Sequence, residues 1–581
     1  MIYVKKMKNI ISLICIVMTL ASCSNTNSTN ISSFEVDNNK NINEKDGFTN
    51  LNEYVAVNYV PGAYDDSIDL EFKILDSNYL VYYTLDGSAP AIMESDLYKK
   101  PIRLEKITSK NLDDYPLTTS VDGILEWDHE GKCVSDIYNN NIQRTGNYPL
   151  FQKQNVVTIR VIKKDTKETV FKRSLTYIID DIDYKIPVVS LTMPYDDWFD
   201  EKTGMYNNIR KEVEKRVYLE YFDFVNDESF ALNSKIKLGG NWTLGYPMRT
   251  LNLNFNKDEN GNKNTPVNAS IFGDRSTRGD ASKKLKKLTR FRLHSGGNTF
   301  ESHTGFNDAV LQGIMEDSNA STTGYRPCIG YLNGEYWGLY YIREHYSDTY
   351  FKDNYDVEKD DVIFYELKGD FIIDDGDEAV GKVLIKELLD YVNTKNFRDY
   401  NVYKTFIEEY IDEESFIDLF LAEAYASNWD FVGNWNNLKM WRTSKVDPSN
   451  PYADGKWRFC IHDVDFAFTE YTNFLDNNSA NPYSRFAMFN NLLKQKEFRD
   501  KFYNRAKELV ETNFEPTYAS KVLNKMVYEV MPYKTNAMIR WGKSSADYNY
   551  WLNDVANTHK YFENKSRAFV ATIEDSLKQF S

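Results

Sequence analysis

The sequence predicts an α+β fold in which a β-rich region precedes a region that combines strands and helices. Short runs of β-branched and aromatic residues, several of them alternating with polar residues, recur from 54 to about 177. Further strand patterns continue to about 346, whereas apolar residues at helical spacing occur at 307–315, 415–425 and 489–510. We therefore expect a β domain at 51–182 and a larger α+β domain at 183–581.

Length and composition predict a large, acidic, globular protein. The 581 residues are enough for several domain-sized units, and 42% of them are hydrophobic, so the chain can bury a large core. The net charge of −16, from 70 basic and 86 acidic residues, would repel nucleic acid, so no nucleic-acid partner is expected. The five cysteines include no CxxC pair, so neither a disulfide framework nor a zinc site is indicated.

The first residues have the pattern of a secretion signal at 1–22. A basic start with Lys5, Lys6 and Lys8 is followed by an apolar run and by the tetrad LASC. This tetrad resembles a bacterial lipobox, which implies cleavage before Cys23 and attachment of a lipid to its sulfur. The polar stretch 23–50 would then be a flexible tether. We expect an extracytoplasmic protein that its lipid anchors to the bacterial cell membrane.

The β domain at 51–182 carries a recognisable set of strands. The segment YYTLDGSAP contains the strong turn signal Asp86-Gly87, and the strand patterns TIRVIKKD and SLTYII follow it. These segments resemble the small immunoglobulin-like domain at the end of chitobiases and β-hexosaminidases. The resemblance implies a β-sandwich without catalytic residues, which would act as a spacer or as a weak sugar contact.

Acid and amide side chains gather in the segment NWDFVGNWNNLKMWR. Asp430 is followed at short spacing by Asn434, Asn436 and Asn437. A carboxylate can position an acceptor hydroxyl, and an amide oxygen can bind Mg²⁺, which prefers hard oxygen ligands. The alternative is that this loop cluster only caps backbone groups or lies in water.

A second acidic segment, KWRFCIHDVDFAF, ends its apolar run with Asp463 and Asp465. Together with Asp430 it predicts a site for magnesium-dependent phosphoryl transfer. Calcium binding by Asp463 and Asp465 is a further alternative, although the sequence lacks the ligand-dense loop of an EF-hand. No nucleophile motif accompanies His462, and we interpret it as packed on the opposite face of its strand.

The strands before these segments carry three further features. Asn333-Gly334 predicts a tight hairpin, and Glu344 follows Arg343 where the outgoing strand ends, a pair that by itself favours a surface salt bridge. Gly239-Gly240 would allow close approach of the backbone to a phosphate. Arg249 stands at the start of a predicted strand, where it could be a surface residue or a phosphate contact.

Several motifs now occur together in one order. From about 186 to 573 the chain resembles the CotH kinase family, the spore-coat protein H group of atypical bacterial protein kinases. The matching blocks are PVVSL, GGNWTLGYPMRTL, LHSGGN with FNDAVLQ, YLNGEYWGLYYIREHY, NWDFVGNWNNLKMWR and GKWRFCIHDVDFAF. The resemblance implies an atypical protein-kinase-like domain, with a mixed sheet and a helical lobe, at 183–581.

The resemblance also implies roles for individual acids and amides. Asp430 matches the catalytic-loop aspartate, which would orient or deprotonate the acceptor hydroxyl. Asn434 or Asn437 matches the metal-binding amide. Asp463 matches the aspartate that binds Mg²⁺ ahead of the nucleotide phosphates, with Asp465 as its near neighbour.

Two positions on the strands are implied to bind the cofactor. Arg249 stands where relatives usually have lysine and would contact a phosphate of ATP, although arginine is bulkier. Glu344 matches a recurrent glutamate after the hairpin and would pair with Arg249, the phosphate-contacting base.

ATP and Mg²⁺ are the implied cofactors, and a protein Ser or Thr or a surface polymer is the implied acceptor. A role in the spore coat would follow from the family. The alternative is a non-catalytic, pseudokinase-like envelope or carbohydrate-binding lipoprotein that keeps the fold without transfer.

Overall fold

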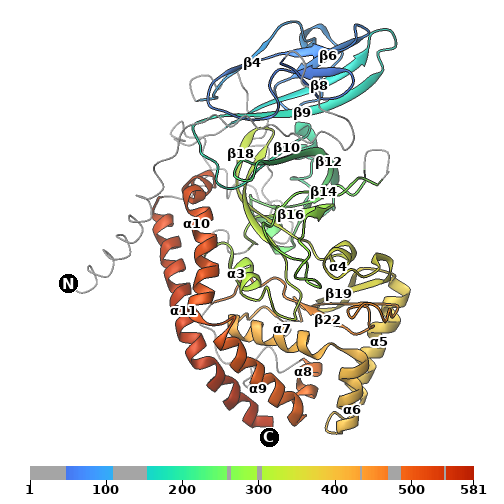
Figure 1. Cartoon of the computed structure of the whole chain (residues 1–581), viewed down its shortest axis with the longest axis vertical. Helices are drawn as coiled ribbons and strands as arrows, with labels where there is room; N and C mark the ends of the chain where they lie inside the picture. Colours follow the sequence, from blue (N-terminus) through green and yellow to red (C-terminus); the bar gives the residue numbers. More distant parts are fainter. Residues whose placement is uncertain are drawn as a thin grey trace, which may run out of the picture. The chain divides into compact units, whose positions relative to one another are not determined.

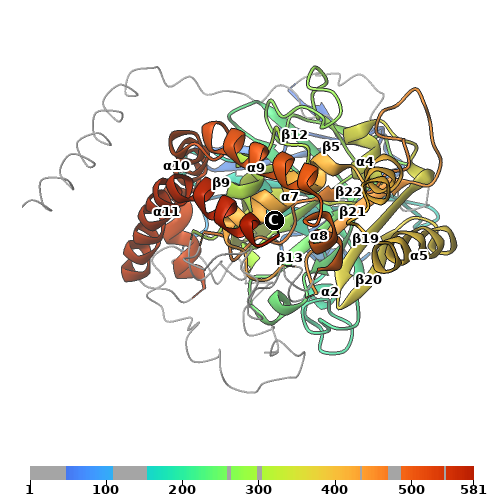
Figure 2. The same cartoon turned by 90° about the horizontal axis from the view of Figure 1, so that it is seen from below.

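The computed structural model describes residues 47–108, 153–257, 263–297, 304–431, 435–468, 486–541 and 545–580. Cys23, the predicted signal peptide, most of the predicted tether and Asn434 lie outside these residues. The fold combines strands and helices, which confirms the α+β prediction (Figures 1 and 2). No helix in the described ranges is both long and apolar enough to cross a membrane.

The β domain consists of three sheets around one hydrophobic core. Its strands are β1 Thr49–Asn50, β2 Val55–Val57, β3 Gly62–Tyr64, β4 Ile68–Leu70, β5 Phe72–Ile74, β6 Tyr79–Thr84, β7 Ile102–Leu104, β8 Asn155–Lys163 and β9 Thr169–Ile179. The largest sheet has the order β3-β9-β8-β6, and Val157 of β8 lies opposite Leu175 of β9 in the core. Strand β1 pairs with β2, so the predicted tether ends before residue 50. The immunoglobulin-like topology stays a prediction.

A closed barrel follows in the order β10-β11-β12-β13-β16-β18-β17. The bounds are β10 Val188–Thr192, β11 Glu214–Asp223, β12 Glu228–Gly239, β13 Thr250–Asn254, β16 Arg290–His294, β17 Tyr325–Leu332 and β18 Glu335–Arg343. The predicted hairpin is confirmed: Asn333 and Gly334 join β17 to β18 with φ values of 47° and 80°, the positive values that a two-residue turn requires. Strand β10 pairs in parallel with β17 and closes the barrel.

A separate four-stranded sheet has the order β20-β19-β21-β22. Its strands are β19 Val362–Lys368, β20 Asp370–Asp375, β21 Lys439–Thr443 and β22 Arg458–Cys460, and a short pair is formed by β14 Val267–Asn268 and β15 Lys287–Leu288. The two sequence segments that carry the acidic residues run through β21 and β22. The sheet therefore brings the loops that flank these two strands to one place.

Helices pack against this sheet, against the barrel and against one another. Their bounds are α2 Tyr195–Phe199, α3 Asn307–Ile314, α4 Asp348–Tyr355, α5 Glu378–Thr394, α6 Tyr400–Thr405, α7 Glu413–Ala426, α8 Ala487–Leu492, α9 Lys496–Glu511, α10 Pro516–Arg540 and α11 Ser545–Leu577. Helix α7 is buried along nearly its whole length, and its Phe416 packs edge-on against Phe459 of β22, with ring centroids 5.0 Å apart. The helices predicted at 307–315 and 415–425 are confirmed as α3 and α7. Helices α10 and α11 lie side by side (Figures 1 and 2).

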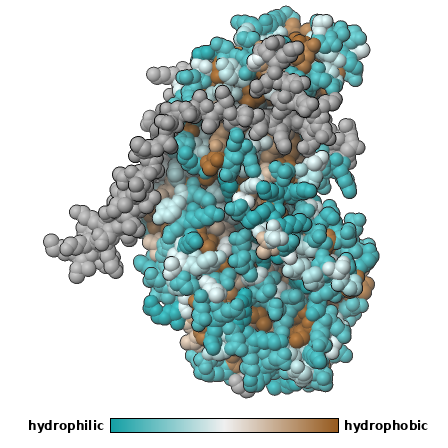
Figure 3. All heavy atoms as spheres, viewed as in Figure 1, coloured by the Kyte–Doolittle hydropathy of each residue, from teal (hydrophilic) through white to brown (hydrophobic). Residues whose placement is uncertain are grey.

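The surface agrees with the acidic composition. Hydrophilic residues cover most of the described face in Figure 3, and hydrophobic ones appear as small scattered patches. Hydrophilic side chains thus cover the described surface, and most of the large apolar side chains are buried in the interior.

Candidate functional site

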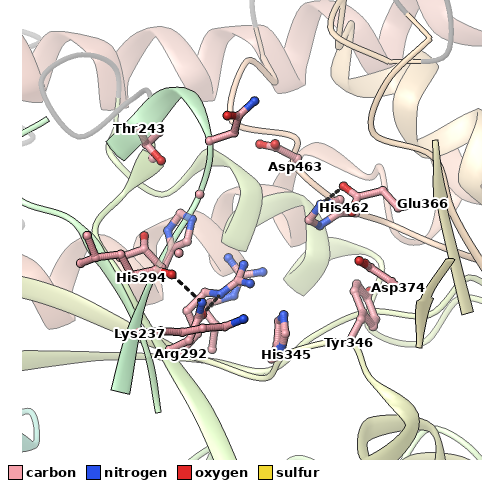
Figure 4. A pocket seen from close by; sticks show the side chains of 18 of the residues that line it. Lys237, Thr243, Arg292, His294, His345, Tyr346, Glu366, Asp374, His462 and Asp463 are labelled. Carbon is pink, nitrogen blue, oxygen red and sulfur yellow. Dashed lines mark hydrogen bonds and ion pairs between the residues drawn. The ribbon is translucent and has the colours of Figure 1, made fainter. Parts of the chain in front are cut away.

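A cavity of about 1160 Å³ lies where the barrel meets the β20-β19-β21-β22 sheet and the loops beside it. Strands β12, β13 and β16 of the barrel form one wall, and β19, β21 and the loops after α7 and β22 form the other. Acidic and basic side chains from both walls point into the cavity (Figure 4). Asp430, Asn437, Asp463 and Asp465 all line it, so two segments far apart in sequence meet here.

Asp430 follows the end of helix α7. The helix begins at Asp412, whose carboxylate accepts a hydrogen bond from the Ser415 N–H at 2.8 Å, and it ends at Ser427 in a left-handed conformation with φ 53°. Asn428 then accepts a hydrogen bond from the Asp430 N–H at 3.3 Å. The turn leaves the half-buried Asp430 side chain at the edge of the cavity.

The side chain of Asn437 contacts Asp430 directly. Its Nδ2 donates to the Asp430 carbonyl oxygen at 2.7 Å and to the Asp430 carboxylate at 3.2 Å. An amide nitrogen cannot bind a cation, so Oδ1 is the one atom of this side chain that could hold Mg²⁺. Asn434, the other predicted amide, lies outside the described residues.

Asp463 lies in the loop after β22 with φ 53° and reaches the solvent inside the cavity. Because protein surrounds this carboxyl on most sides, burial raises its pKa; His462 opposes the shift, and the carboxylates of Asp308 and Asp430 add to it. A bound cation would relieve this repulsion.

Asp465 is buried against the backbone of Gly297, which belongs to the LHSGGN block. A Cβ atom at Gly297 would lie 1.8 Å from Asp465 Oδ2, and the φ of Gly297 is 58°. Glycine is required here for both reasons. The contact fixes the position of Asp465 at the cavity wall.

The donor set fits Mg²⁺ bound together with a phosphate better than a metal held by protein alone. Within the described ranges no three His, Cys, Asp or Glu side chains are grouped closely enough to hold a metal ion. Mg²⁺ commonly uses one or two carboxylates and completes its shell with water and substrate phosphates. Asp463, Asp430 and the Asn437 oxygen line the same cavity and can supply such a partial shell.

Cationic side chains line the opposite wall. Lys237 of β12 and Arg292 of β16 point into the cavity across from Asp463 and His462 (Figure 4). Arg292 donates through Nε to Asn252 Oδ1 at 2.8 Å, which holds the guanidinium in place. Burial and the neighbouring Arg343 lower the pKa of Arg292. Two cations that face acids across a cavity can bind the negative oxygens of a phosphate chain.

A second charged network lies on the other sheet. Lys439 donates to Glu366 at 3.0 Å and to Asp374 at 2.6 Å, and its Nζ lies 4.9 Å from the Phe364 ring centre. His462 lies with Nε2 3.5 Å from the Glu366 carboxylate and lines the cavity. The prediction that His462 packs on the opposite face is therefore wrong. Lys439 stands inside the block NWDFVGNWNNLKMWR, so the sequence offered a signal for it.

Helix α3 braces the Asp463 loop from the barrel side. Asp308 forms a buried ion pair with Arg343, and its Oδ1 accepts hydrogen bonds from Gln312 at 3.1 Å and from the Val464 N–H at 3.3 Å. Although burial opposes ionisation, Arg343 and His294 hold the pKa of Asp308 at about 2. The charged pair thus fixes the backbone between Asp463 and Asp465.

The predicted phosphate contact at Arg249 is wrong. Its side chain is 1% exposed and does not line the cavity. It donates to the carbonyl oxygens of Leu244 at 2.8 Å and Tyr246 at 3.1 Å and also to that of Tyr206, whose ring lies beneath it. Arg249 shares its side of the strand with core residue Leu251, because side chains alternate between the two faces. Burial lowers the pKa of Arg249 to about 10.

The predicted pairing of Glu344 is also wrong. Glu344 does border the cavity, but it is buried, and its carboxylate lies 3.2 Å from Arg275 Nε. It also accepts hydrogen bonds from the Gly324 N–H at 2.7 Å and from Asn354 at 2.9 Å. Neither Arg249 nor Arg343 is its partner, since Arg343 binds Asp308 and neighbouring strand residues face opposite sides.

These features define a class of protein: a mixed α+β protein with acids and cations facing each other across one cavity. The family model described as CotH kinase protein matches residues 236–569, which is more than half of the chain. The chain belongs to the CotH kinase family. The model described as Fn3 associated matches residues 72–171, within the β domain. No curated protein matches the chain.

Proposed function

We propose that the protein transfers the γ-phosphoryl group of ATP, in the presence of Mg²⁺, to a hydroxyl of a protein Ser or Thr or of a surface polymer. One observation carries this proposal: Asp430 and Asp463, from separate segments, line the same cavity opposite Lys237 and Arg292. Membership of the CotH kinase family supports it. Acids for a cation and a hydroxyl, and cations for phosphates, are the parts that phosphoryl transfer needs.

Each residue then has a distinct task. Asp430, oriented by Asn437, would accept a hydrogen bond from the acceptor hydroxyl and align it with the phosphorus atom. Asp463 and the Asn437 oxygen would hold Mg²⁺, which neutralises charge on the phosphoryl oxygens when bound. Lys237 and Arg292 would bind the remaining phosphate oxygens from the barrel side. Because most of the barrier is lowered by position and charge, the residues need no covalent step.

We further propose that the enzyme acts outside the cell, held at the membrane by a lipid on Cys23. The LASC tetrad supports this location, and the β domain would set the distance between the membrane and the cavity. A role in the spore coat would follow the family.

The alternative is a non-catalytic envelope or carbohydrate-binding protein. Arginine in place of lysine at position 249 favours this alternative only if the side chain lies at the site, and Arg249 lies in the barrel core. The β domain remains compatible with a binding role.

Titration of the protein with Mg-ATP by calorimetry separates the two functions. We expect wild type to bind and Asp463→Ala to bind at least tenfold more weakly, because the ligand for the cation is gone. Asp317→Ala, at an exposed acid outside the cavity, is the matched control and should bind like wild type. Absence of heat with wild type would favour the non-catalytic alternative.

A further inference from the structure

Two residues with left-handed backbone bound the acidic segments. Ser427, with φ 53°, immediately precedes the turn to Asp430, and Phe468, with φ 66°, ends the segment that carries Asp463 and Asp465. Non-glycine residues rarely adopt this conformation, and they keep it where neighbouring groups hold them. The two ends are joined, because the Phe468 N–H donates to the Ala426 carbonyl at 2.8 Å.

One helix, α11, contacts both of these residues. Lys565 donates through Nζ to Ser427 Oγ at 2.7 Å. The Tyr561 hydroxyl lies 2.9 Å from the same oxygen and also bonds to the Tyr425 carbonyl. On the other segment, the Phe468 ring packs edge-on against Tyr561 and Phe562, with centroids 5.7 and 5.1 Å away. Tyr561 therefore touches both segments at once.

Asn428, the residue after Ser427, contacts the backbone of both acids. Asn428 is 1% exposed and bonds to the Glu423 carboxyl of α7 at 2.9 Å. Its Nδ2 lies 3.5 Å from the Asp463 carbonyl oxygen, and its Oδ1 accepts from the Asp430 N–H at 3.3 Å. A shift of Ser427 would move Asn428 and would change the separation of the two carboxylates.

We propose that Tyr561 and Lys565 are positioning residues, through which α11 holds the Asp430 and Asp463 segments in the geometry that phosphoryl transfer requires. The inference rests on the proposed function for its catalytic consequence, but not for its structural content. Neither residue lines the cavity, so neither is expected to touch ATP or the acceptor. They lie more than 90 residues beyond the acids in sequence.

The test uses the full chain with Tyr561→Phe and Lys565→Met. Two matched controls lie on the same helix: Tyr550→Phe, at a residue that is 68% exposed, and Lys560→Met, at an exposed lysine. Hydrogen exchange is measured on peptides that cover 424–431 and 461–468. We expect exchange there to rise in both test variants and in neither control. Equal exchange in all five proteins would overturn the proposal.

Kinetics separate this proposal from the proposed function. If wild type turns over ATP, kcat should fall by about 10- to 100-fold in the test variants while KM changes less than about twofold, because misplacement of the acids affects the reacting geometry rather than phosphate binding. Ser427→Ala combined with Lys565→Met should cost no more than the larger single change. Unchanged kcat in Tyr561→Phe and Lys565→Met would overturn the positioning role. If wild type shows no turnover, the proposed function fails, and hydrogen exchange alone decides whether α11 holds the two segments.

Discussion

Asn437 donates through its amide nitrogen to both the carbonyl oxygen and the carboxylate of Asp430, at 2.7 and 3.2 Å. One side chain thus fixes the backbone and the orientation of the acid that we place at the acceptor hydroxyl. The pair links two points of the single connection between α7 and β21, so the position of the acid depends on how this connection folds.

Asn437→Ala should lower kcat for ATP turnover by about 10- to 100-fold, because a hydrogen bond to a charged group is lost at the reacting centre. Steady-state turnover at saturating Mg-ATP measures this. Asn436→Ala is the control, since Asn436 lines the same cavity and has no contact with Asp430 among the described hydrogen bonds. Equal losses in the two variants would contradict the orienting role of Asn437.

Arg249 and Arg292 offer the same substitution with opposite expected results. Arg249→Met leaves three carbonyl oxygens, two of them buried, without this donor and should lower the free energy of unfolding by about 3 kcal/mol. Arg292→Met should leave stability within about 1 kcal/mol and weaken Mg-ATP binding about tenfold. Urea unfolding and calorimetric titration of both variants check this. If only Arg249→Met weakened Mg-ATP binding, Arg249 would be the phosphate contact after all.

Gly297→Ala should disturb the site through Asp465. The added Cβ would lie 1.8 Å from the Asp465 carboxylate in a backbone conformation with φ 58°. Gly273→Ala is the matched control, because Gly273 has φ 63° and nothing within 4 Å of the added atom. Both variants should lose about 1 kcal/mol of stability from backbone strain, but only Gly297→Ala should also lose ATP turnover. Similar turnover in the two would contradict a role for the Gly297 contact.

Glu220 should make stability depend on pH. Its buried carboxylate accepts a hydrogen bond from the Thr176 N–H at 3.2 Å, and burial raises its pKa from 4.5 to about 7 against the opposing effects of Thr176 and Arg173. The folded state therefore binds more protons than the unfolded state between these pH values, and the free energy of unfolding falls as pH rises through them.

Glu220→Gln removes this titration. The free energy of unfolding of the variant, relative to that of wild type, should therefore rise by about 2 kcal/mol between pH 5 and pH 8. Urea unfolding of both proteins at the two pH values measures the difference. Parallel pH dependence in the two proteins would show that Glu220 does not titrate in this range.

The acids of the site could be predicted from the sequence because each ends a local pattern: Asp430 follows a helical stripe, and Asp463 follows an apolar strand. Lys237 and Arg292, two cations that line the cavity, were not identified from the sequence. For Lys237 the sequence does carry a signal. Its neighbours Ile236 and Leu238 both pack against the barrel core, and side chains alternate along a strand, so Lys237 must lie on the opposite face.

Contacts between residues that lie far apart in the sequence could not be predicted from local sequence patterns. The Asp308–Arg343 pair spans 35 residues, and Tyr561 lies 134 residues from Ser427. Arg249 and Glu344 were assigned by family position, but the side to which each points depends on strand register and on contacts with Tyr206 and Arg275.

The central claim is that Asp430 and Asp463 together serve phosphoryl transfer in one cavity. The most direct measurement is Mg-dependent turnover of ATP by wild type, Asp430→Ala and Asp463→Ala, with Asp317→Ala as control. The account predicts turnover in wild type and control and a loss of about 100-fold or more in each cavity variant. Turnover that is the same in all four proteins would contradict it.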